Sequence, residues 1–313
     1  MPVKIPILLS FYALSNGDTT LLFGQVTYTG FSDLSFRDYN RRKTFRTLIK
    51  LYRTKSYANQ DIRLMLSGRN VPATTNRHGA FYVKTSENIR EGVLEKVLLA
   101  TGEEVKMVDG LYLKTVNHVQ GDNIVISDLD DTLMHSFIYR KLRKFRTLMF
   151  TTVEKRKAVV HMQELMKSFI SKGAIPIYLS NSEQNLYPLI YRFLMHNGFP
   201  PGPLFLKQMR KLVDVIMNIK FPPNNTHKIS TLEELLALFP KQKFILMGDN
   251  TQHDLSIYLS AAEKFGNSIR YIIIRKVIEK KADELLIEKA QEMLKVNNIN
   301  LYYSDDFPKS FEL

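Results

Sequence analysis

The chain has 313 residues, of which 44% are hydrophobic, so it is long enough for two domains or one large one with an apolar core. Its formal net charge of +13 favours an anionic partner, such as a phosphorylated substrate, a nucleic acid or an anionic lipid surface. It contains no cysteine, which excludes disulfides and thiolate chemistry and leaves oxygen or imidazole groups as the ligands of any metal.

Residues 1–120 are expected to form a small β-rich domain that resembles a β-sandwich, because short apolar stretches alternate with turn residues. The first two stretches flank Asn16-Gly17-Asp18, a hairpin turn signal, so the apolar start is interpreted as a β-hairpin rather than a signal peptide. Val71–Gly79 is expected to be a connection that ends in a tight turn. The strands expected in this part are Ile5–Leu14, Thr19–Tyr28, Asp61–Ser67, Ala80–Thr85 and Val93–Leu99.

One helix is expected within this β-rich part, over Tyr39–Lys55. Phe45, Leu48, Ile49 and Tyr52 recur at helical spacing, and the rest of the helix is strongly basic. Such a helix lies on an anionic membrane surface or packs its apolar stripe on its own domain, and both alternatives stay open. Its basic residues are Arg41, Arg42, Lys43, Arg46, Lys50, Arg53 and Lys55.

From Asn123 onward, strands alternate with helices, which predicts an α/β domain with a parallel sheet over residues 121–313. Ligands of such sheets bind at the carboxyl ends of the strands. The expected strands are Ile124–Asp128, Ala174–Leu179, Phe244–Gly248, Ser268–Arg275 and Ile299–Tyr303. The expected helices are Val159–Ser171, Leu186–His196, Thr231–Phe239, Asp254–Phe265 and Glu279–Val296.

The most informative stretch is Ile124–Thr132, an apolar strand that ends in three aspartates. Carboxylates are costly to bury unpaired, so this strand end needs a cation or a catalytic purpose. Residues two apart on an extended chain share a face, which directs Asp128 and Asp130 to one point while Asp131 turns away. The alternative is an acidic turn in which an aspartate caps a helix. The pattern D-x-D-x-T after an apolar strand resembles the first motif of the haloacid dehalogenase phosphohydrolases.

Two later strand ends supply candidate partners for these carboxylates. Ser180 follows the second strand, and its hydroxyl and the backbone amides around Asn181 would donate hydrogen bonds to a phosphoryl group. Asp249 follows the third strand, where Gly248 allows close approach of the backbone and the aspartate suits a metal ligand. Asp254 supports a metal or caps the next helix. Carboxylate ligands favour a hard cation such as Mg²⁺.

A lysine is also needed to balance the charge of a transferring phosphoryl group. Lys228 opens the helix before the third strand and is preferred for this position, while Lys207 is the competing candidate.

A basic stretch with interleaved apolar residues, Tyr139–Lys157, follows the acidic motif. In this position a phosphohydrolase would place a flap that grips an anionic lipid, but a solvated surface excursion fits the composition equally well. Its basic residues are Arg140, Lys141, Arg143, Lys144, Arg146, Lys155, Arg156 and Lys157.

A more specific resemblance covers roughly residues 120–280. Its motifs are S-D-L-D-D-T at 127–132, Y-L-S-N-S-E-Q-N-L-Y-P-L-I-Y-R-F-L-M-H-N-G-F-P-P-G-P-L-F-L-K at 178–207, H-K at 227–228 and G-D-N-T-Q-H-D-L-S-I-Y at 248–258. These are similar to the catalytic domain of the actin-patch type phosphatidate phosphatases, distant relatives of the lipins, and the β-rich part is similar to the N-terminal region of bacterial members. One departure is Ser182-Glu183-Gln184, which stands where the family has an S-P-W type triplet and affects the local substrate contact.

The resemblance implies a haloacid dehalogenase-like, Rossmann-like domain that hydrolyses phosphatidate to diacylglycerol and phosphate with Mg²⁺, through an aspartyl-phosphate intermediate. It implies Asp128 as the nucleophile and Asp130 as the general acid and base. The phosphate ligands would be Ser180 and Lys228, and the Mg²⁺ ligands would be Asp128 and Asp249. Beyond the resemblance, we expect Asn181 as a further phosphate ligand and Asp130 and Asp254 as further metal ligands.

Two other functions stay open: a phosphomonoesterase for a soluble substrate, and a non-catalytic module that binds phosphatidate. Retention of both Asp128 and Asp130 speaks against the non-catalytic module, since a sensor needs no general acid. No nucleic-acid partner is expected, because the basic residues form no recognisable binding module. No apolar run is long enough to cross a bilayer, so we expect a soluble, cytoplasmic protein that binds anionic membranes peripherally if at all.

Overall fold

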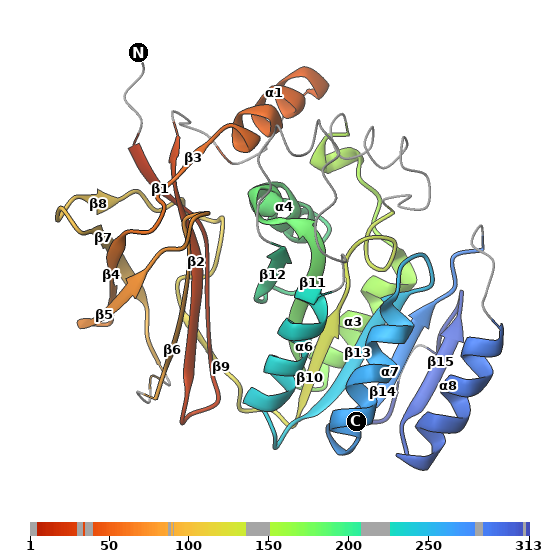
Figure 1. Cartoon of the computed structure of the whole chain (residues 1–313). Coiled ribbons are helices and arrows are strands. Elements are labelled where there is room, and N and C mark those ends of the chain that lie inside the picture. Colours follow the sequence, from red (N-terminus) through yellow and green to blue (C-terminus); the bar gives the residue numbers. More distant parts are fainter. Residues whose placement is uncertain are drawn as a thin grey trace. The chain divides into compact units, whose positions relative to one another are not determined.

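The computed structural model describes residues 5–29, 34, 40–86, 89, 91–135, 151–207, 226–278, 284–308 and 311–313. These residues divide into two compact units (Figure 1). The first takes the described residues of Met1–Gln120 and Ser182–Leu194, and the second takes those of Gly121–Asn181, Met195–Lys207 and Phe221–Leu313. The first unit thus includes a stretch beyond residue 120, and a division into domains at 1–120 and 121–313 stays a proposal.

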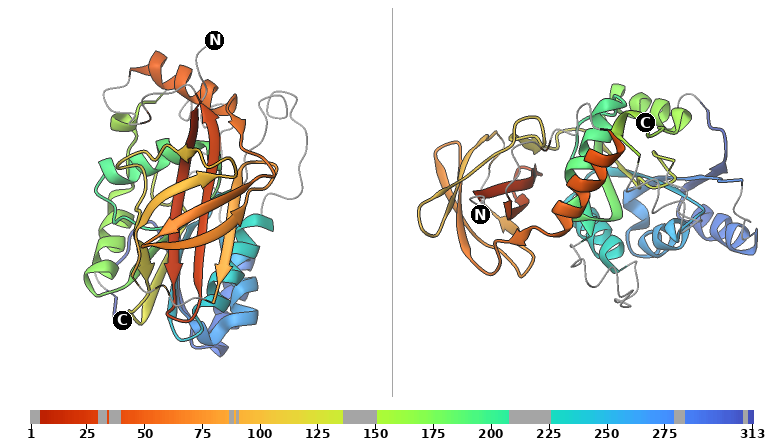
Figure 2. Two further views of the ribbon diagram at one scale, coloured as in Figure 1. Left: turned by 90° about the vertical axis from the view of Figure 1, so that its left-hand side faces the viewer. Right: turned by 90° about the horizontal axis from the view of Figure 1, so that it is seen from above.

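Two sheets, helix α1 (Arg41–Tyr52) and most of helix α4 (Tyr187–His196) make up the first unit. In the five-stranded sheet, β9 (Val116–His118) pairs in parallel with β1 (Ile5–Ser15), and β1 pairs antiparallel with β2 (Thr20–Thr29). The other edge of β2 pairs with both β3 (Lys55–Ser56) and β6 (Ala80–Thr85). The second sheet has the order β5-β4-β7-β8, and its strands cross in front of β1 and β2 in the left view of Figure 2. They are β4 (Asp61–Leu66), β5 (Arg69–Thr74), β7 (Leu94–Leu99) and β8 (Glu104–Val105).

The hairpin predicted at Asn16-Gly17-Asp18 is confirmed. The side-chain oxygen of Asn16 accepts hydrogen bonds from the backbone amides of Asp18 and Thr19, at 2.9 and 2.7 Å. Gly17 has a φ of 94°, which lies in the left-handed region that favours glycine. The turn chemistry that the sequence suggested therefore sets the register of β1 against β2.

The predicted connection over Val71–Gly79 is wrong at its start, because Val71–Thr74 belongs to strand β5. Pro72 has no amide proton, which argued against a strand. However, β5 is the edge strand of the four-stranded sheet. No strand lies on its outer side to accept a hydrogen bond, so a residue without an amide proton is tolerated there. The short strands β3, β8 and β9 were also not predicted.

Helix α1 (Arg41–Tyr52) lies within the predicted range, and the side chain of Asn40 caps it by accepting from the amide of Lys43 at 2.8 Å. Its buried face is rotated from the predicted stripe, because small threonines occupy two of the buried positions. The buried residues are Thr44, Thr47, Leu48 and Leu51, whereas Phe45, Ile49 and Tyr52 are half-buried. The basic side chains Arg41, Arg42, Lys43, Arg46 and Lys50 are exposed.

The second unit is α/β with a parallel sheet, as predicted. The six-stranded order is β12-β11-β10-β13-β14-β15, and each pair from β11 to β15 is parallel. The strands are β10 (Asn123–Ser127), β11 (Ile175–Glu183), β12 (Leu204–Lys207), β13 (Lys243–Asp249), β14 (Ile269–Arg275) and β15 (Asn300–Ser304). Of these, β12 was not predicted.

The helices differ from prediction mainly at their ends. They are α3 (Val160–Ser171), α4 (Tyr187–His196), α6 (Thr226–Leu238), α7 (Asp254–Phe265) and α8 (Glu284–Val296), with 3-10 turns at Val153–Lys155, Gln184–Leu186 and Gly266–Ser268. Helix α6 begins five residues before the predicted Thr231, which places Lys228 in its first turn. The predicted flap over 139–150 and the predicted helix start over 279–283 lie outside the described residues. None of the described helices has the length and hydropathy of a membrane span.

Candidate active site

The candidate site lies where the strand order of the parallel sheet reverses. From β10 the chain adds β11 and β12 on one side, and it then adds β13, β14 and β15 on the other. Asp128 follows β10 directly, and its amide donates to the carbonyl of Met247 on β13 at 2.8 Å. Such a reversal point leaves a crevice at the carboxyl ends of the strands, which is where ligands of open α/β sheets bind.

Lys228 connects two of the predicted carboxylates. Its Nζ donates to Asp128 Oδ1 at 2.9 Å and also to Asp254 Oδ1. All three side chains are buried, with at most 1% of each exposed. The first turn of α6 and the start of α7 therefore bring an ammonium and a second carboxylate to the end of β10.

Asp249, the last residue of β13, completes the group. One carboxylate oxygen from each of Asp128, Asp249 and Asp254 lies within 4.8 Å of the others. Gly248 makes this approach possible, because a Cβ at that position would lie 2.6 Å from Asp254 Oδ2 and 2.7 Å from Asp254 Cβ. Here the glycine is required by space rather than by its backbone conformation.

Two hydroxyl groups that the sequence did not single out orient these carboxylates. Thr132 Oγ1 lies 3.3 Å from Asp128 Oδ2 and 3.0 Å from Asp249 Oδ2, and its hydroxyl donates to one of them at a time. Both the amide and the hydroxyl of Thr251 donate to Asp249 Oδ1, the amide at 2.6 Å. The threonine of D-x-D-x-T was the available signal for Thr132, but Thr251 belongs to no pattern recognisable from one sequence.

The buried charges perturb one another strongly. Burial raises the pKa of Asp128 well above its usual range, and Asp254 and Asp249 add to this, although Lys228 opposes it. Burial also raises the pKa of Asp249 to about 7, with a further contribution from Asp254. Burial alone would lower the pKa of Lys228, but Asp128 and Asp254 raise it above its usual range. The lysine is therefore charged, whereas burial and the neighbouring carboxylates oppose the ionisation of Asp128 and Asp249.

The donor set fits a divalent cation. Three carboxylates against one ammonium leave an excess of two negative charges when all are ionised, and this excess is buried. Buried carboxylates in such numbers are stabilised by a cation, and oxygen ligands suit a hard one. Asp130, which the sequence also suggested as a ligand, is not part of this group, although its charge raises the pKa of Asp128.

The turn after Asp128 has an unusual backbone. Asp131 has a φ of 59°, in the left-handed region, and its amide donates to the carbonyl of Met134 at 2.7 Å. Arg275 Nη1 donates to the carbonyl of Asp131 at 2.6 Å, so β14 holds this turn. Asp130 is 3% exposed and lies inside the same turn. The backbone reversal at Asp131 suits a residue that shapes the turn.

The remaining predicted residues lie farther along the sheet. Ser180 is fully buried near the end of β11, next to Asn181, whose side-chain oxygen is buried without a hydrogen-bond partner among the described residues. Lys207 ends β12 and adds to the burial that lowers the pKa of His227, whereas Lys228 contacts the carboxylates themselves. At the departure from the family triplet, Gln184 is 1% exposed, and neither polar atom of its side chain has a partner within the described chain.

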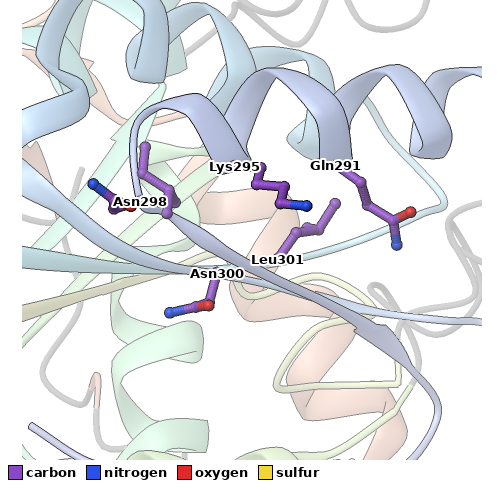
Figure 3. A pocket seen from close by; sticks show the side chains of 6 residues that line it. Gln291, Lys295, Asn298, Asn300 and Leu301 are labelled. Atoms are coloured by element: carbon purple, nitrogen blue, oxygen red, sulfur yellow. The ribbon is translucent and has the colours of Figure 1, made fainter.

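Within its described residues, the second unit has one pocket at the far end of the sheet from this group of carboxylates and another that reaches Asp249. One of about 340 Å³ lies at the end of α8 and the amino end of β15, lined by Gln291, Lys295, Asn298, Ile299, Asn300 and Leu301 (Figure 3). Because the strands are parallel, this is the opposite end of the sheet from the carboxylates. The other, of about 240 Å³, reaches Asp249 and has a mixed lining, in which apolar residues such as Leu255 and Ile274 lie beside polar ones such as Asn250 and His253.

The comparisons with known proteins concern the segment that carries this site. Residues 123–276 match the family model of the phosphatidate phosphatase APP1 catalytic domain. Phosphatidate phosphatase APP1 of Saccharomyces cerevisiae is 32% identical over 177 residues, which are 56% of this chain and 29% of that protein. The uncharacterized protein C29B5.04c of Schizosaccharomyces pombe is 26% identical over 239 residues, which are 74% of this chain and 38% of that protein.

The chain thus spans less than two fifths of the length of these curated relatives. Among solved structures, a carbohydrate acetylesterase from Xanthomonas citri covers 99% of this chain and 71% of its own, with 11% identity and a TM-score of 0.32. A similarity this low carries no argument about fold or function.

The raised pKa of Asp249 predicts a pH-dependent stability in the presence of a chelator. Between about pH 4 and pH 7, folded Asp249 holds a proton that the unfolded chain has released, so its contribution to the free energy of unfolding falls as pH rises. His227, whose pKa burial lowers to about 4, acts in the opposite direction, so the comparison must isolate Asp249. Urea unfolding of the wild type and of Asp249→Asn at several pH values does this. The wild type should lose stability relative to the variant as pH rises, and a relative gain would contradict the assignment.

Proposed function

Because residues 123–276 match the family model of the phosphatidate phosphatase APP1 catalytic domain, we propose that the chain belongs to this family and is a Mg²⁺-dependent phosphatidate phosphatase. It would hydrolyse phosphatidate to diacylglycerol and phosphate. The observation that carries the proposal is the contact of Lys228 with Asp128 and Asp254 beside Asp249, within the segment that matches this family. We also propose that the parallel sheet is a haloacid dehalogenase-like fold and that the two sheets of the first unit form a β-sandwich.

Asp128 is the proposed nucleophile. An oxygen of its carboxylate attacks phosphorus, and the bond between phosphorus and the leaving alcohol oxygen breaks, which leaves an aspartyl-phosphate. Asp130, two residues on, gives its proton to the leaving oxygen and later takes a proton from the attacking water. Its burial within the turn after β10 keeps it beside Asp128.

Lys228 supports this chemistry electrostatically. Its ammonium is 2.9 Å from Asp128 Oδ1, so it would also reach an oxygen of a phosphoryl group attached to that carboxylate. Ser180 and the backbone near Asn181 are proposed as further phosphate ligands from the neighbouring strand. Asp128, Asp249 and Asp254 would hold Mg²⁺, which supplies the positive charge that lets a carboxylate and a phosphate approach each other.

The lipid assignment rests on the match of residues 123–276 to the phosphatidate phosphatase family model. The pocket that reaches Asp249 has a mixed lining, in which apolar residues lie beside polar ones such as Asn250, His253 and Tyr303, and neither Asp128 nor Lys228 lines it. It therefore does not distinguish a phosphorylated lipid from a soluble phosphoester.

Substitution of the nucleophile tests the proposed activity. With phosphatidate in mixed micelles and Mg²⁺, Asp128→Asn should lower phosphate release by about 10³-fold or more, because the amide cannot form the aspartyl-phosphate. Asp131→Asn is the matched control and should keep activity within about tenfold, because asparagine tolerates the left-handed backbone. Wild-type turnover by Asp128→Asn would refute the mechanism. A much higher kcat/KM for a water-soluble ester than for phosphatidate would refute the lipid assignment alone.

The exposed basic face of α1 is proposed to bind anionic membranes peripherally. Arg42 and Arg46 are exposed one turn apart, and each basic residue near such a surface contributes about 1 kcal/mol. Arg42→Glu with Arg46→Glu should therefore weaken binding to phosphatidate-containing vesicles by about 30-fold or more, without changing turnover of a soluble ester. Arg63→Glu with Lys96→Glu makes the same change in net charge on the four-stranded sheet and should have a smaller effect. Equal losses from the two pairs would show that only net charge matters.

A further inference from the structure

Arg156 differs from its basic neighbours. It belongs to a stretch in which Lys155 and Lys157 are exposed, yet only 4% of Arg156 is exposed. Arginine is almost never fully buried without a partner, because removing a guanidinium from water costs several kcal/mol. The side chain therefore has a specific position in the second unit rather than a place on a solvated surface.

The contacts of Arg156 place it against the turn that carries Asp130. Its Nε donates to the carbonyl of Thr151 at 3.3 Å, and its Nη1 lies 3.9 Å from the sulfur of Met134. The backbone of Met134 forms one bridge with Asp130 and another with Ala158, two residues beyond Arg156. Three short backbone segments thus meet here, and Met134 links Arg156 to Asp130.

The charge on Arg156 also favours an interaction with Asp130. Burial lowers the pKa of Arg156 to about 10, and Asp130 raises it, so the guanidinium stays charged near neutral pH. Asp130 is itself 3% exposed, so a negative charge left on it after proton transfer would be shielded from water and would interact with the guanidinium more strongly than a surface charge would.

We propose that Arg156 is a positioning residue for Asp130, and this inference rests on the function proposed above. When Asp130 passes its proton to the leaving alcohol oxygen, the electron pair of the broken phosphorus–oxygen bond stays on that oxygen and a negative charge remains on Asp130. The buried guanidinium stabilises this charge and holds the carboxyl group in place. Arg156 would thus act through Asp130, without contact with the substrate.

The leaving group distinguishes this role from a structural one. An alkyl phosphomonoester needs protonation of its leaving oxygen, whereas p-nitrophenyl phosphate releases a stable phenolate without it. Arg156→Met should therefore lower kcat/KM for the alkyl ester by about 10²-fold and for the aryl ester by less than about fivefold. kcat/KM reports the first transfer alone, so later hydrolysis of the aspartyl-phosphate does not enter the comparison.

Further variants keep the test decisive. Arg156→Lys retains the positive charge, so it should lose less kcat/KM on the alkyl ester than Arg156→Met does. If Arg156→Met does not fold, Arg156→Lys is used for the comparison of the two esters. In an Asp130→Asn background, Arg156→Met should cost less than about threefold, since the residue through which it acts is gone. Lys155→Met and Lys157→Met are matched controls that should leave both substrates unaffected.

Equal losses on the two esters, or an undiminished loss in the Asp130→Asn background, would overturn the positioning role. Failure of the proposed function gives a different result, because Asp128→Asn would then still hydrolyse both esters. An inactive Asp128→Asn together with equal losses for Arg156→Met would refute the role of Arg156 and leave the phosphatase assignment intact.

Discussion

Excess negative charge buried at the carboxyl end of β10 is the constraint on which the rest of the second unit depends. Asp128, Asp249 and Asp254 converge there with Lys228 as the ammonium that contacts two of them. Each carboxylate is inaccessible to water, so their mutual repulsion is only weakly screened. A fold gains no stability from such an arrangement, which indicates that it is maintained for chemistry.

Several local features allow these charged side chains to lie close together. Gly248 lets Asp254 pack against β13 at a distance that a side chain would forbid, and Asp131 reverses the chain in a left-handed conformation so that Asp130 stays in the turn. Thr132 spans two carboxylates with one hydroxyl group. The reversal of strand order at β10 brings together residues that are more than a hundred positions apart, such as Asp128 and Asp249. The site is therefore a product of the sheet topology and of local turn geometry together.

The features of the site that follow from the alternation of strands and helices were predicted from the sequence. The carboxyl ends of parallel strands meet at one edge, so aspartates at the ends of β10 and β13 were expected to converge, and Lys228 was preferred to Lys207 from its place on a helix. The contacts of Thr251 were not predictable, because they depend on the turn between β13 and α7. The buried face of α1 was misplaced because threonine was not counted as a core residue, and β5 was missed because a proline interrupts it at a sheet edge. The burial of Arg156 has no signal in a run of basic residues.

The central claim is that Asp128 becomes phosphorylated during turnover. The most direct measurement is a rapid acid quench of the wild-type protein reacting with phosphatidate and Mg²⁺, followed by mass spectrometry of the peptide that contains residues 124–132. Acyl phosphates survive acid quenching but are cleaved by hydroxylamine, so a hydroxylamine-labile phosphoryl group on Asp128 is the predicted result, and it should be absent from Asp128→Asn. Phosphate release without any phosphorylated Asp128 at any quench time, or a label on another residue, would contradict the account.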